Sequence, residues 1–322
     1  MTKEEFLAEW HNDNPRILVH TSGSTGKPKP LMVEKRRMLN SARITCDFLG
    51  LKPGDTALLC MPLDYIAGKM MVVRSLQRDL RLTSVRPSSH PLADETLPSF
   101  TFAAMVPMQV YNSLKVPCER ERLMRIRHLI IGGGAISDEL AQMIKPLPNA
   151  VWSTYGMTET LSHIALRRLN GPDASLWYTP FDGVGISLNA DGCLVIDAPE
   201  VCAEPLVTND IAQLRTDDRT GKTLFRIKGR KDNVVCSGGI KIQIEEVEET
   251  LRPHLSAPFM IIKKQDEMLG EKAILLTEST DLTHIEEICR NTLPKYWVPR
   301  EFLHIDHLPL TETGKPKRSG AF

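Results

Sequence analysis

The sequence predicts an α/β protein with a large domain, built on a mostly parallel sheet with helices, and a small α+β C-terminal domain. Short β-like runs alternate with helix-like runs up to about residue 175, a pattern typical of parallel sheets. Glycine-rich loops follow several of the predicted strands. The 322 residues, 42% hydrophobic and 25% charged, are also more than one small packed core requires.

The elements of the large domain follow from local patterns. The run ILVH (17–20) predicts a strand, and Gly50 ends a helix predicted over 34–50. Ser137 is a preferred N-cap residue for the helix that starts with DEL at 138–140. The other predicted elements are strands over 56–61, 128–131 and 150–155 and a helix over 67–77.

The pattern changes in the second half of the chain. Strand-like runs around an Asn-Ala-Asp-Gly turn within 183–197 predict a hairpin. Further on, the order of elements is βαββαβ-like, which fits a small α+β domain. These elements are a run over 223–235, an acidic amphipathic helix over 242–251, strands over 259–264 and 272–277, a helix over 284–293 and a strand over 301–308. We expect an N-terminal domain over 1–229, a hinge at 230–232 and a mobile C-terminal domain over 233–322.

Composition excludes several classes of protein. The 40 basic and 40 acidic residues give no net charge, so the sequence favours neither a nucleic-acid partner nor a membrane surface. Seven scattered cysteines without a Cys-x-x-Cys pair fit a reducing compartment. The N-terminus shows no secretory signal, and no apolar run approaches the ~20 residues of a transmembrane helix. We therefore expect a cytoplasmic protein.

The stretch HTSGSTGKPKP (20–30) is a candidate phosphate-binding loop. Glycines expose backbone N–H groups, and hydroxyls and one lysine add further donors for an anion. Gly23 and Gly26 are too close together for a Walker A loop, and proline follows Lys27, which disfavours a phosphotransferase. A flexible surface loop is the alternative. Nucleotide binding is favoured because the loop follows a predicted strand and precedes a predicted helix.

Two further loops have a composition suited to a nucleotide. IIGGGAIS (130–137) places three glycines after a strand, so that backbone can approach a flat ligand; a tight strand–helix turn is the alternative. STYGMTET (153–160) places hydroxyls beside a carboxylate, which suits a hydrated Mg²⁺ between phosphates; a capping role is the alternative. We expect the three loops to converge at the carboxyl ends of the strands, where open α/β sheets bind ligands.

These motifs resemble those of a known family. HTSGSTGKPK, GGGAIS, YGMTET, VTND, GRKDNVVCSGG and LPLTETGK follow one another as in the adenylate-forming superfamily of acyl- and aryl-CoA synthetases, luciferases and peptide-synthetase adenylation domains. The resemblance covers residues 17–318. It implies ATP and Mg²⁺ as cofactors and an acid that attacks the α-phosphate of ATP, so that pyrophosphate leaves. A thiol, usually coenzyme A, then displaces AMP. This chemistry depends on charge neutralisation and positioning.

The resemblance implies an ATP site in the large domain. Gly133, Gly134 and Ala135 would form the backbone around adenine, and Tyr155, followed by Gly156, would pack on the ring. Thr158 would contact phosphate and Glu159 would bind the metal. The implied phosphate loop contains Thr21, Ser22, Gly23, Ser24, Thr25, Gly26 and Lys27.

The resemblance also implies roles for residues near and beyond the boundary. Asp210 matches the acid that accepts both ribose hydroxyls, although the family usually has Gly where this chain has Asn209; a turn aspartate is the alternative. Arg230 matches an arginine near the ribose or phosphate, and Asp232 matches the hinge.

Two further matches concern the individual half-reactions. Gly238 and Gly239 match a loop that serves thioester formation, where a simple turn is the alternative. Lys315 matches the lysine that bridges the carboxylate and the α-phosphate, where an ordinary exposed lysine is the alternative.

One segment indicates the substrate. MPLDYIAGKMMVVRSL (61–76) resembles a segment of the o-succinylbenzoate–CoA ligases of menaquinone biosynthesis, with Tyr65 where His is usual. Arg74 matches an arginine for the second carboxylate of the substrate. An arginine on an apolar helix requires a partner, so a buried structural ion pair is the alternative. Thr160 and Ser162 are expected to line the acyl pocket, whereas His163 fits a core histidine equally well.

The resemblance therefore implies an AMP-forming acid–CoA ligase, most like one for o-succinylbenzoate. The alternatives are a ligase for another aryl or medium-chain acid and a non-catalytic nucleotide-binding paralogue. Family members usually carry a longer segment before the first phosphate loop, and here only 19 residues precede His20. We expect a shortened first domain whose exposed apolar face is covered by a partner chain, such as a second copy in a homo-oligomer.

Overall fold

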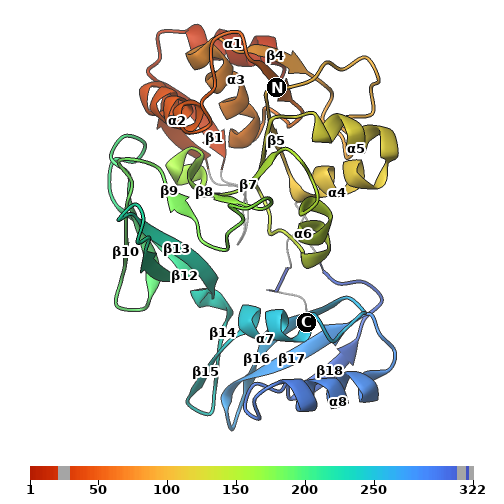
Figure 1. Ribbon diagram of the computed structural model, residues 1–322. Helices are drawn as coiled ribbons and strands as arrows, with labels where there is room; N and C mark the ends of the chain where they lie inside the picture. The colour runs from red at the N-terminus through yellow and green to blue at the C-terminus, as the bar shows by residue number, and fades with distance from the viewer. Residues whose placement is uncertain (21–29, 310–316, 319–322) are drawn as a thin grey trace. The chain divides into compact units, whose positions relative to one another are not determined.

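The computed structural model describes residues 1–20, 30–309 and 317–318 and divides into two compact units (Figure 1). The first unit contains Met1–Ile186, Ile196–Leu206 and Arg215–Phe225, and the second contains Ser187–Val195, Val207–Leu214 and Arg226–Phe322. The continuous part of the second unit thus starts close to the predicted domain boundary. A hinge at 230–232 stays a prediction.

The first unit is built on a seven-stranded sheet of order β4-β3-β5-β6-β7-β8-β9. The pairs from β4 to β7 are parallel, and β8 and β9 are antiparallel, so the prediction of a mostly parallel sheet is confirmed. The strands β3, β5 and β6 are apolar and almost fully buried, as strands covered on both faces require. The bounds are Thr56–Leu59 (β3), Arg81–Ser84 (β4), Phe102–Met105 (β5), His128–Ile131 (β6), Ala150–Gly156 (β7), His163–Arg168 (β8) and Thr179–Pro180 (β9).

Six helices precede β7 among the described residues. They are α1 (Lys3–His11), α2 (Lys35–Phe48), α3 (Ile66–Arg78), α4 (Pro107–Lys115), α5 (Pro117–Met124) and α6 (Asp138–Ile144). The buried residues of α2 recur every three or four positions, and α2 packs against α3. Gly50 follows α2 with φ of +65°, and the Ser137 hydroxyl accepts a hydrogen bond from the Leu140 N–H at 3.2 Å. Both predicted helix boundaries are confirmed.

The strand–loop–helix arrangement predicted for the first glycine-rich loop is wrong. The strands β1 (Arg16–His20) and β2 (Pro30–Glu34) pair antiparallel, with His20 opposite Pro30, and form a separate two-stranded sheet. The helix α2 begins only after β2, so the segment 21–29 connects two strands of a hairpin. The local pattern missed β2 because this strand is defined by its pairing with β1.

A four-stranded sheet of order β10-β11-β12-β13 has its strands divided between the two units. The strands are β10 (Gly185–Leu188), β11 (Cys193–Asp197), β12 (Leu206–Thr216) and β13 (Thr223–Arg230). The Asn189 N–H donates to the Cys193 carbonyl at 3.0 Å, and Gly192 has φ of +77°. Glycine tolerates this left-handed conformation better than other residues do. Because β10 and β11 are neighbours in the sheet and this turn connects them, the predicted hairpin is confirmed.

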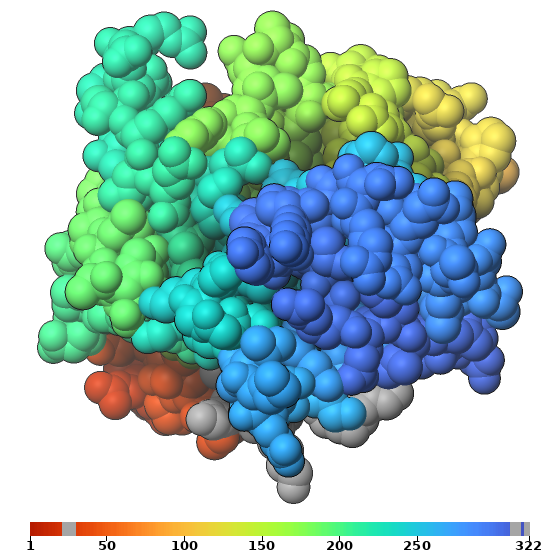
Figure 2. Space-filling view, turned by 90° about the horizontal axis from the view of Figure 1, so that it is seen from below, coloured from red at the N-terminus to blue at the C-terminus, as the bar shows by residue number. Residues whose placement is uncertain are grey.

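The continuous part of the second unit contains a further sheet and two helices, drawn in cyan to blue in Figures 1 and 2. Its elements are β14 (Val234–Ser237), β15 (Ile240–Gln243), α7 (Ile244–Leu251), β16 (Phe259–Asp266), β17 (Gly270–Thr277), α8 (Leu282–Thr292) and β18 (Glu301–His304). The helix predicted from residue 242 starts at Ile244, since Ile242 and Gln243 belong to β15. Within the described ranges, no helix has the length and apolar character to cross a bilayer.

Candidate active site

Two of the three predicted ligand loops leave the same edge of the large sheet. Residues 132–137 follow β6 and residues 157–162 follow β7, and these neighbouring strands are parallel. The phosphate-loop residues Thr21 to Lys27 lie outside the described residues, and the strand that precedes them belongs to another sheet. The expectation that all three loops follow strands of one sheet is therefore wrong, whereas the other two loops are brought together as predicted.

The glycine loop after β6 is closely packed. A Cβ atom on Gly132 would lie 2.5 Å from the Thr154 hydroxyl on β7, and Gly133 has φ of +80°. A Cβ on Gly134 would lie 3.4 Å from the ring of Pro107. Glycines 132 and 133 are thus required by the backbone path itself, as in the tight strand–helix turn that was the alternative. The proposed adenine contacts of Gly133, Gly134 and Ala135 stay predictions.

An aromatic cluster surrounds Tyr155 at the end of β7. The Tyr155 ring centroid lies 5.0 Å from that of Phe225 and 5.8 Å from that of Tyr178. The Tyr178 and Phe225 rings stack at 5.3 Å, and the Tyr178 hydroxyl lies 2.9 Å from the Ser153 hydroxyl. Sequence analysis missed Tyr178 and Phe225, because a backbone bridge between distant segments brings them to β7. These contacts hold the Tyr155 ring, which is expected to pack on adenine, in one orientation.

The loop after β7 is braced by its own side chains. Gly156 allows a close approach, since a Cβ there would lie 2.2 Å from the Ser162 carbonyl oxygen. The Thr160 hydroxyl accepts from the Met157 N–H at 2.9 Å and lies 2.6 Å from the Ser162 carbonyl oxygen. Thr160 is fully buried, so the geometry gives it a bracing role, and its expected contact with substrate stays a prediction. Thr158 is also buried, whereas Glu159 is exposed.

The exposed carboxylate of Glu159 fits one kind of metal. In the described ranges, no three His, Cys, Asp or Glu side chains gather into a metal-binding group. A Mg²⁺ ion bound with phosphates keeps several waters and requires only one or two protein carboxylates. The donor set therefore fits a magnesium ion that arrives with a nucleotide.

Arg74 is the most unusual charged group in the described core. It lies on α3, is 2% exposed and donates from Nη2 to the Ser162 hydroxyl; its Nη1 lies 4.0 Å from the Met71 sulfur. Its Nε has no hydrogen-bond partner, and no described carboxylate pairs with it. Burial lowers its pKa to about 10, so the guanidinium stays charged at neutral pH. The structural ion pair that was the alternative is not what the described residues show.

His163 contacts the same Ser162 hydroxyl as this arginine. Its Nδ1 is 3.1 Å from the Ser162 hydroxyl, and its Nε2 is 3.1 Å from the Thr45 hydroxyl on α2. Burial and the neighbouring Arg74 charge hold the pKa of His163 well below its usual value. Sequence analysis missed Thr45, although a signal existed: Ser41 and Thr45 are polar residues four positions apart on the buried face of α2.

Three predicted residues of the second unit meet as a charged group. Arg230, at the end of β13, contacts Asp210 on β12 at 3.3 Å and Asp232 at 3.0 Å. Asn209 donates to the same Asp232 carboxylate at 3.4 Å. Asp210 is therefore more than an isolated turn aspartate, because it pairs with the arginine that the resemblance places beside the ribose. Its contact with a ribose stays a prediction.

Gly238 and Gly239 form the two-residue turn between β14 and β15. Their φ angles are +56° and +83°, and Ser237 pairs with Ile240 on either side of them. A turn of this kind requires left-handed backbone at both central positions, which accounts for both glycines. The predicted role of this loop in thioester formation stays a prediction.

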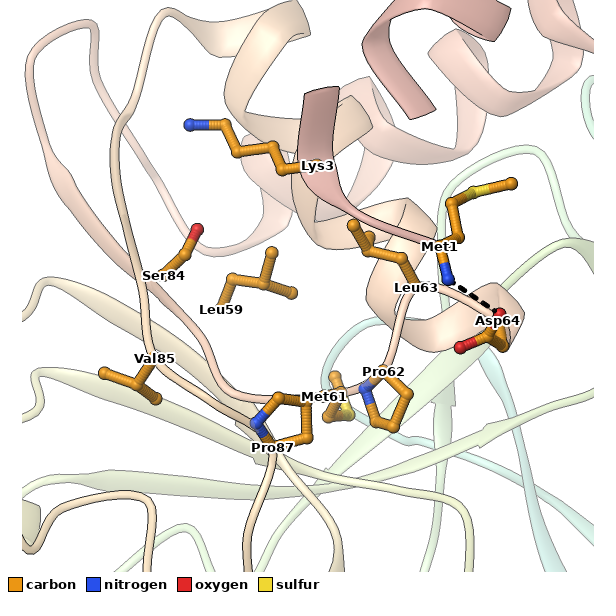
Figure 3. A pocket seen from close by; sticks show the side chains of 10 residues that line it. All are labelled: Met1, Lys3, Leu59, Met61, Pro62, Leu63, Asp64, Ser84, Val85 and Pro87. Carbon is orange, nitrogen blue, oxygen red and sulfur yellow. Dashed lines mark hydrogen bonds and ion pairs between the residues drawn. The ribbon is translucent and has the colours of Figure 1, made fainter. Parts of the chain in front are cut away.

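A cavity of about 230 Å³ lies at the carboxyl ends of β3 and β4 (Figure 3). Leu59, Ser84 and residues 61–64 line it, and the Met1 amine donates to Asp64 at 3.2 Å beside it. Tyr65, the exposed N-cap residue of α3, follows this lining segment directly. In the part of the chain that the structure describes, the predicted site residues do not line this cavity. Lys315 lies outside the described residues.

Comparison with known proteins identifies the family. The family model for AMP-binding enzymes matches residues 3–203, which is more than half of the chain. This chain is an AMP-binding enzyme. The family resemblance inferred from the six ordered motifs is thereby confirmed.

Individual relatives of this AMP-binding enzyme cover nearly its whole length. It is similar to the 2-succinylbenzoate–CoA ligase of Bacillus mycoides (strain KBAB4), with 25% identity over 97% of this chain and 70% of the relative. An acyl-CoA synthetase (AMP-forming)/AMP-acid ligase II-like protein from Dyadobacter fermentans has a solved structure with 33% identity. The match has a TM-score of 0.68 and covers 98% of this chain and 91% of that one.

A third match shows the fold alone. The O-succinylbenzoate coenzyme A synthetase from Bacillus subtilis was solved in complex with ATP and magnesium ion. It matches with a TM-score of 0.74 and 22% identity over 94% of this chain and 69% of that chain.

Proposed function

We propose that this AMP-binding enzyme is an ATP-dependent acid–CoA ligase whose substrate is o-succinylbenzoate. The acid would attack the α-phosphate of ATP, with release of pyrophosphate, and the thiol of coenzyme A would then displace AMP from the acyl-adenylate. The family match and the names of the relatives support the reaction class.

The observation that carries the choice of acid is the buried guanidinium of Arg74, which no described carboxylate compensates. A buried charge without a counter-ion is costly, and a carboxylate brought by a ligand would offset that cost. o-Succinylbenzoate has two carboxylates, so one can be activated while the other pairs with Arg74. A monocarboxylic acid would leave the guanidinium unpaired once its own carboxylate became part of the adenylate.

The other residues would bind ATP and stabilise developing charge. Glu159 would hold a magnesium ion, which neutralises phosphate charge when bound. Thr158 would contact phosphate, and Arg230 with Asp210 would bind near the ribose. Lys315 would bridge the attacking carboxylate and the α-phosphate during adenylation. Rotation at Asp232 would then replace that lysine by the Gly238–Gly239 turn for thioester formation.

Acid-dependent exchange of pyrophosphate into ATP tests this proposal, with o-succinylbenzoate, benzoate and octanoate as acids. We expect the fastest exchange with o-succinylbenzoate. Arg74→Met should lower kcat/KM for this acid by ~100-fold or more, since a charge-assisted pair is lost, and should leave benzoate unaffected. Arg125→Met is the matched control, because this arginine on the protein surface has only an exposed ion pair at 3.8 Å.

Three outcomes would contradict the proposal in different ways. No exchange with any acid by the folded chain would leave a non-catalytic nucleotide-binding protein. Faster exchange with benzoate or octanoate would keep the ligase but reject the substrate. Release of ADP in place of AMP would indicate a phosphotransferase.

A further inference from the structure

Four side chains form a largely buried series of hydrogen bonds that links three elements of the first unit. Arg74 is on α3, Thr45 is on α2, His163 begins β8, and the half-buried Ser162 directly precedes it. Arg74 donates to the Ser162 hydroxyl, which lies 3.1 Å from His163 Nδ1. His163 Nε2 lies 3.1 Å from the Thr45 hydroxyl, which lies 3.1 Å from the Ser41 carbonyl.

The two ends of this series fix its direction. An arginine can only donate, so the Ser162 oxygen accepts at one end; a carbonyl can only accept, so the Thr45 hydroxyl donates to Ser41 at the other. The Thr45 oxygen then accepts from His163 Nε2–H. A neutral imidazole carries one proton, so its Nδ1 must accept the remaining hydroxyl proton of Ser162. Each hydrogen bond of the series has one donor and one acceptor in this one arrangement.

The surroundings of His163 favour the neutral ring that this arrangement requires. The Phe181 ring lies edge-on at 5.5 Å, the Thr45 hydroxyl is uncharged, and the charged group facing His163 is Arg74. A second positive charge here would be buried beside the first. Burial and Arg74 accordingly lower the pKa of His163 well below its usual value.

We propose that His163, as the neutral Nε2–H tautomer held by Thr45, is a positioning residue that orients the Ser162 hydroxyl and thereby the anion-binding guanidinium of Arg74. This inference rests on the proposed function, because it concerns how Arg74 is presented to the second carboxylate of the acid. Ser162 is the side chain that holds Nη2, while Nε is left without a partner. If His163 did not take the Ser162 proton, the hydroxyl could rotate and its lone pair would no longer face Arg74.

Three variants test this proposal. His163→Gln keeps one acceptor and one donor, His163→Phe keeps a ring without either, and Thr45→Val removes the hydroxyl at nearly constant shape. We expect His163→Phe to raise KM for o-succinylbenzoate by ~10-fold, the value of about one hydrogen bond, with kcat and the benzoate KM little changed. Thr45→Val should act in the same direction, and His163→Gln should restore KM to within about threefold of wild type.

A spectroscopic measurement on the wild-type protein separates this inference from the proposed function. Nitrogen-15 NMR of the imidazole rings should show His163 with an unprotonated Nδ1 and a protonated Nε2, and Ser162→Ala should shift the Nδ1 resonance. A protonated Nδ1 would overturn the inference even if the ligase activity were confirmed. An equal rise in KM for o-succinylbenzoate and benzoate, or no rescue of KM by His163→Gln, would likewise show that His163 is only a packing residue. If no acid were activated, the NMR measurement of the His163 tautomer would still test the proposed hydrogen-bond arrangement.

Discussion

Two arginines with little side-chain exposure, one in each unit, differ in their partners. Arg318, near the C-terminus, makes a bidentate ion pair with Glu248 on α7, at 2.7 and 2.8 Å. Glu248 is almost fully buried and also accepts from the Ile261 N–H at 2.7 Å. Arg74 is buried more deeply, yet the described residues offer it one hydroxyl and no carboxylate.

This difference separates a structural charge from one that, under the proposed function, pairs with a ligand. The pair of Arg318 and Glu248 is complete within the second unit and ties the chain end near the predicted catalytic lysine to α7. The Lys317 N–H also donates to the Pro309 carbonyl at 2.9 Å. For Arg74 the described residues offer no carboxylate, and under the proposed function a substrate carboxylate would complete the pair.

The largest effect should follow from breaking the complete pair. Glu248→Ala leaves Arg318 with a charge that its surroundings no longer compensate and removes an acceptor from the Ile261 backbone. We expect the free energy of unfolding of the second unit to fall by about 3–5 kcal/mol, measured by urea denaturation and amide hydrogen exchange.

The neighbouring residue on the same helix provides the control for this prediction. Glu249 makes an exposed pair with Arg226 at 3.1 Å, so Glu249→Ala should cost about 1 kcal/mol or less. Equal losses in the two variants would show that the pair of Glu248 and Arg318 contributes no more than a surface contact.

The second prediction concerns the incomplete pair. Arg74→Met replaces an uncompensated buried charge by an apolar side chain of similar length, so we expect the free energy of unfolding to stay unchanged or rise by about 1–2 kcal/mol. The same urea titration measures it. A loss of several kcal/mol would show that Arg74 has a structural partner, and the contrast between the two arginines would fail.

Much of the fold could be predicted because its signals are local. The apolar run HLII, the N-cap Ser137 and the Asn189–Gly192 turn each specify their own element, and all three are confirmed. The strand β2 was not predicted, because its five residues become a strand only by pairing with β1. The antiparallel strand β8 was also not predicted, although it begins with His163, a member of the hydrogen-bonded series that ends at Arg74.

The sequence predicted the motifs of the candidate site but not the side chains that pack against them. The loops at 132–137 and 156–160 carry glycines and hydroxyls that identify themselves in sequence. Thr45, Tyr178 and Phe225 approach these loops from distant segments, and no local pattern connects them. That Arg74 lacks a carboxylate could not be predicted either, because it depends on which side chains the whole core places around it.

The smallest predicted effect concerns pH and links His163 to the unpaired charge of Arg74. Because the folded-state pKa of His163 is depressed, the unfolded chain binds a proton below about pH 6.5 that the folded chain does not bind. This group therefore stabilises the folded state above about pH 6.5, and its contribution is lost at about 1.4 kcal/mol per pH unit as the pH falls.

His163→Gln should remove this slope, measured as the difference between the two proteins in urea titrations from pH 7.5 to 5.5. The subtraction cancels the titration of His128, whose pKa is also lowered by burial. In an Arg74→Met background the slope should still begin near pH 6.5, which the unfolded chain sets, but it should end at a higher pH if the arginine contributes to the depression, since less positive charge then opposes protonation of the folded chain. Parallel curves for wild type and His163→Gln would mean that His163 is protonated equally in both states, and the charge of Arg74 would then have to be compensated after all.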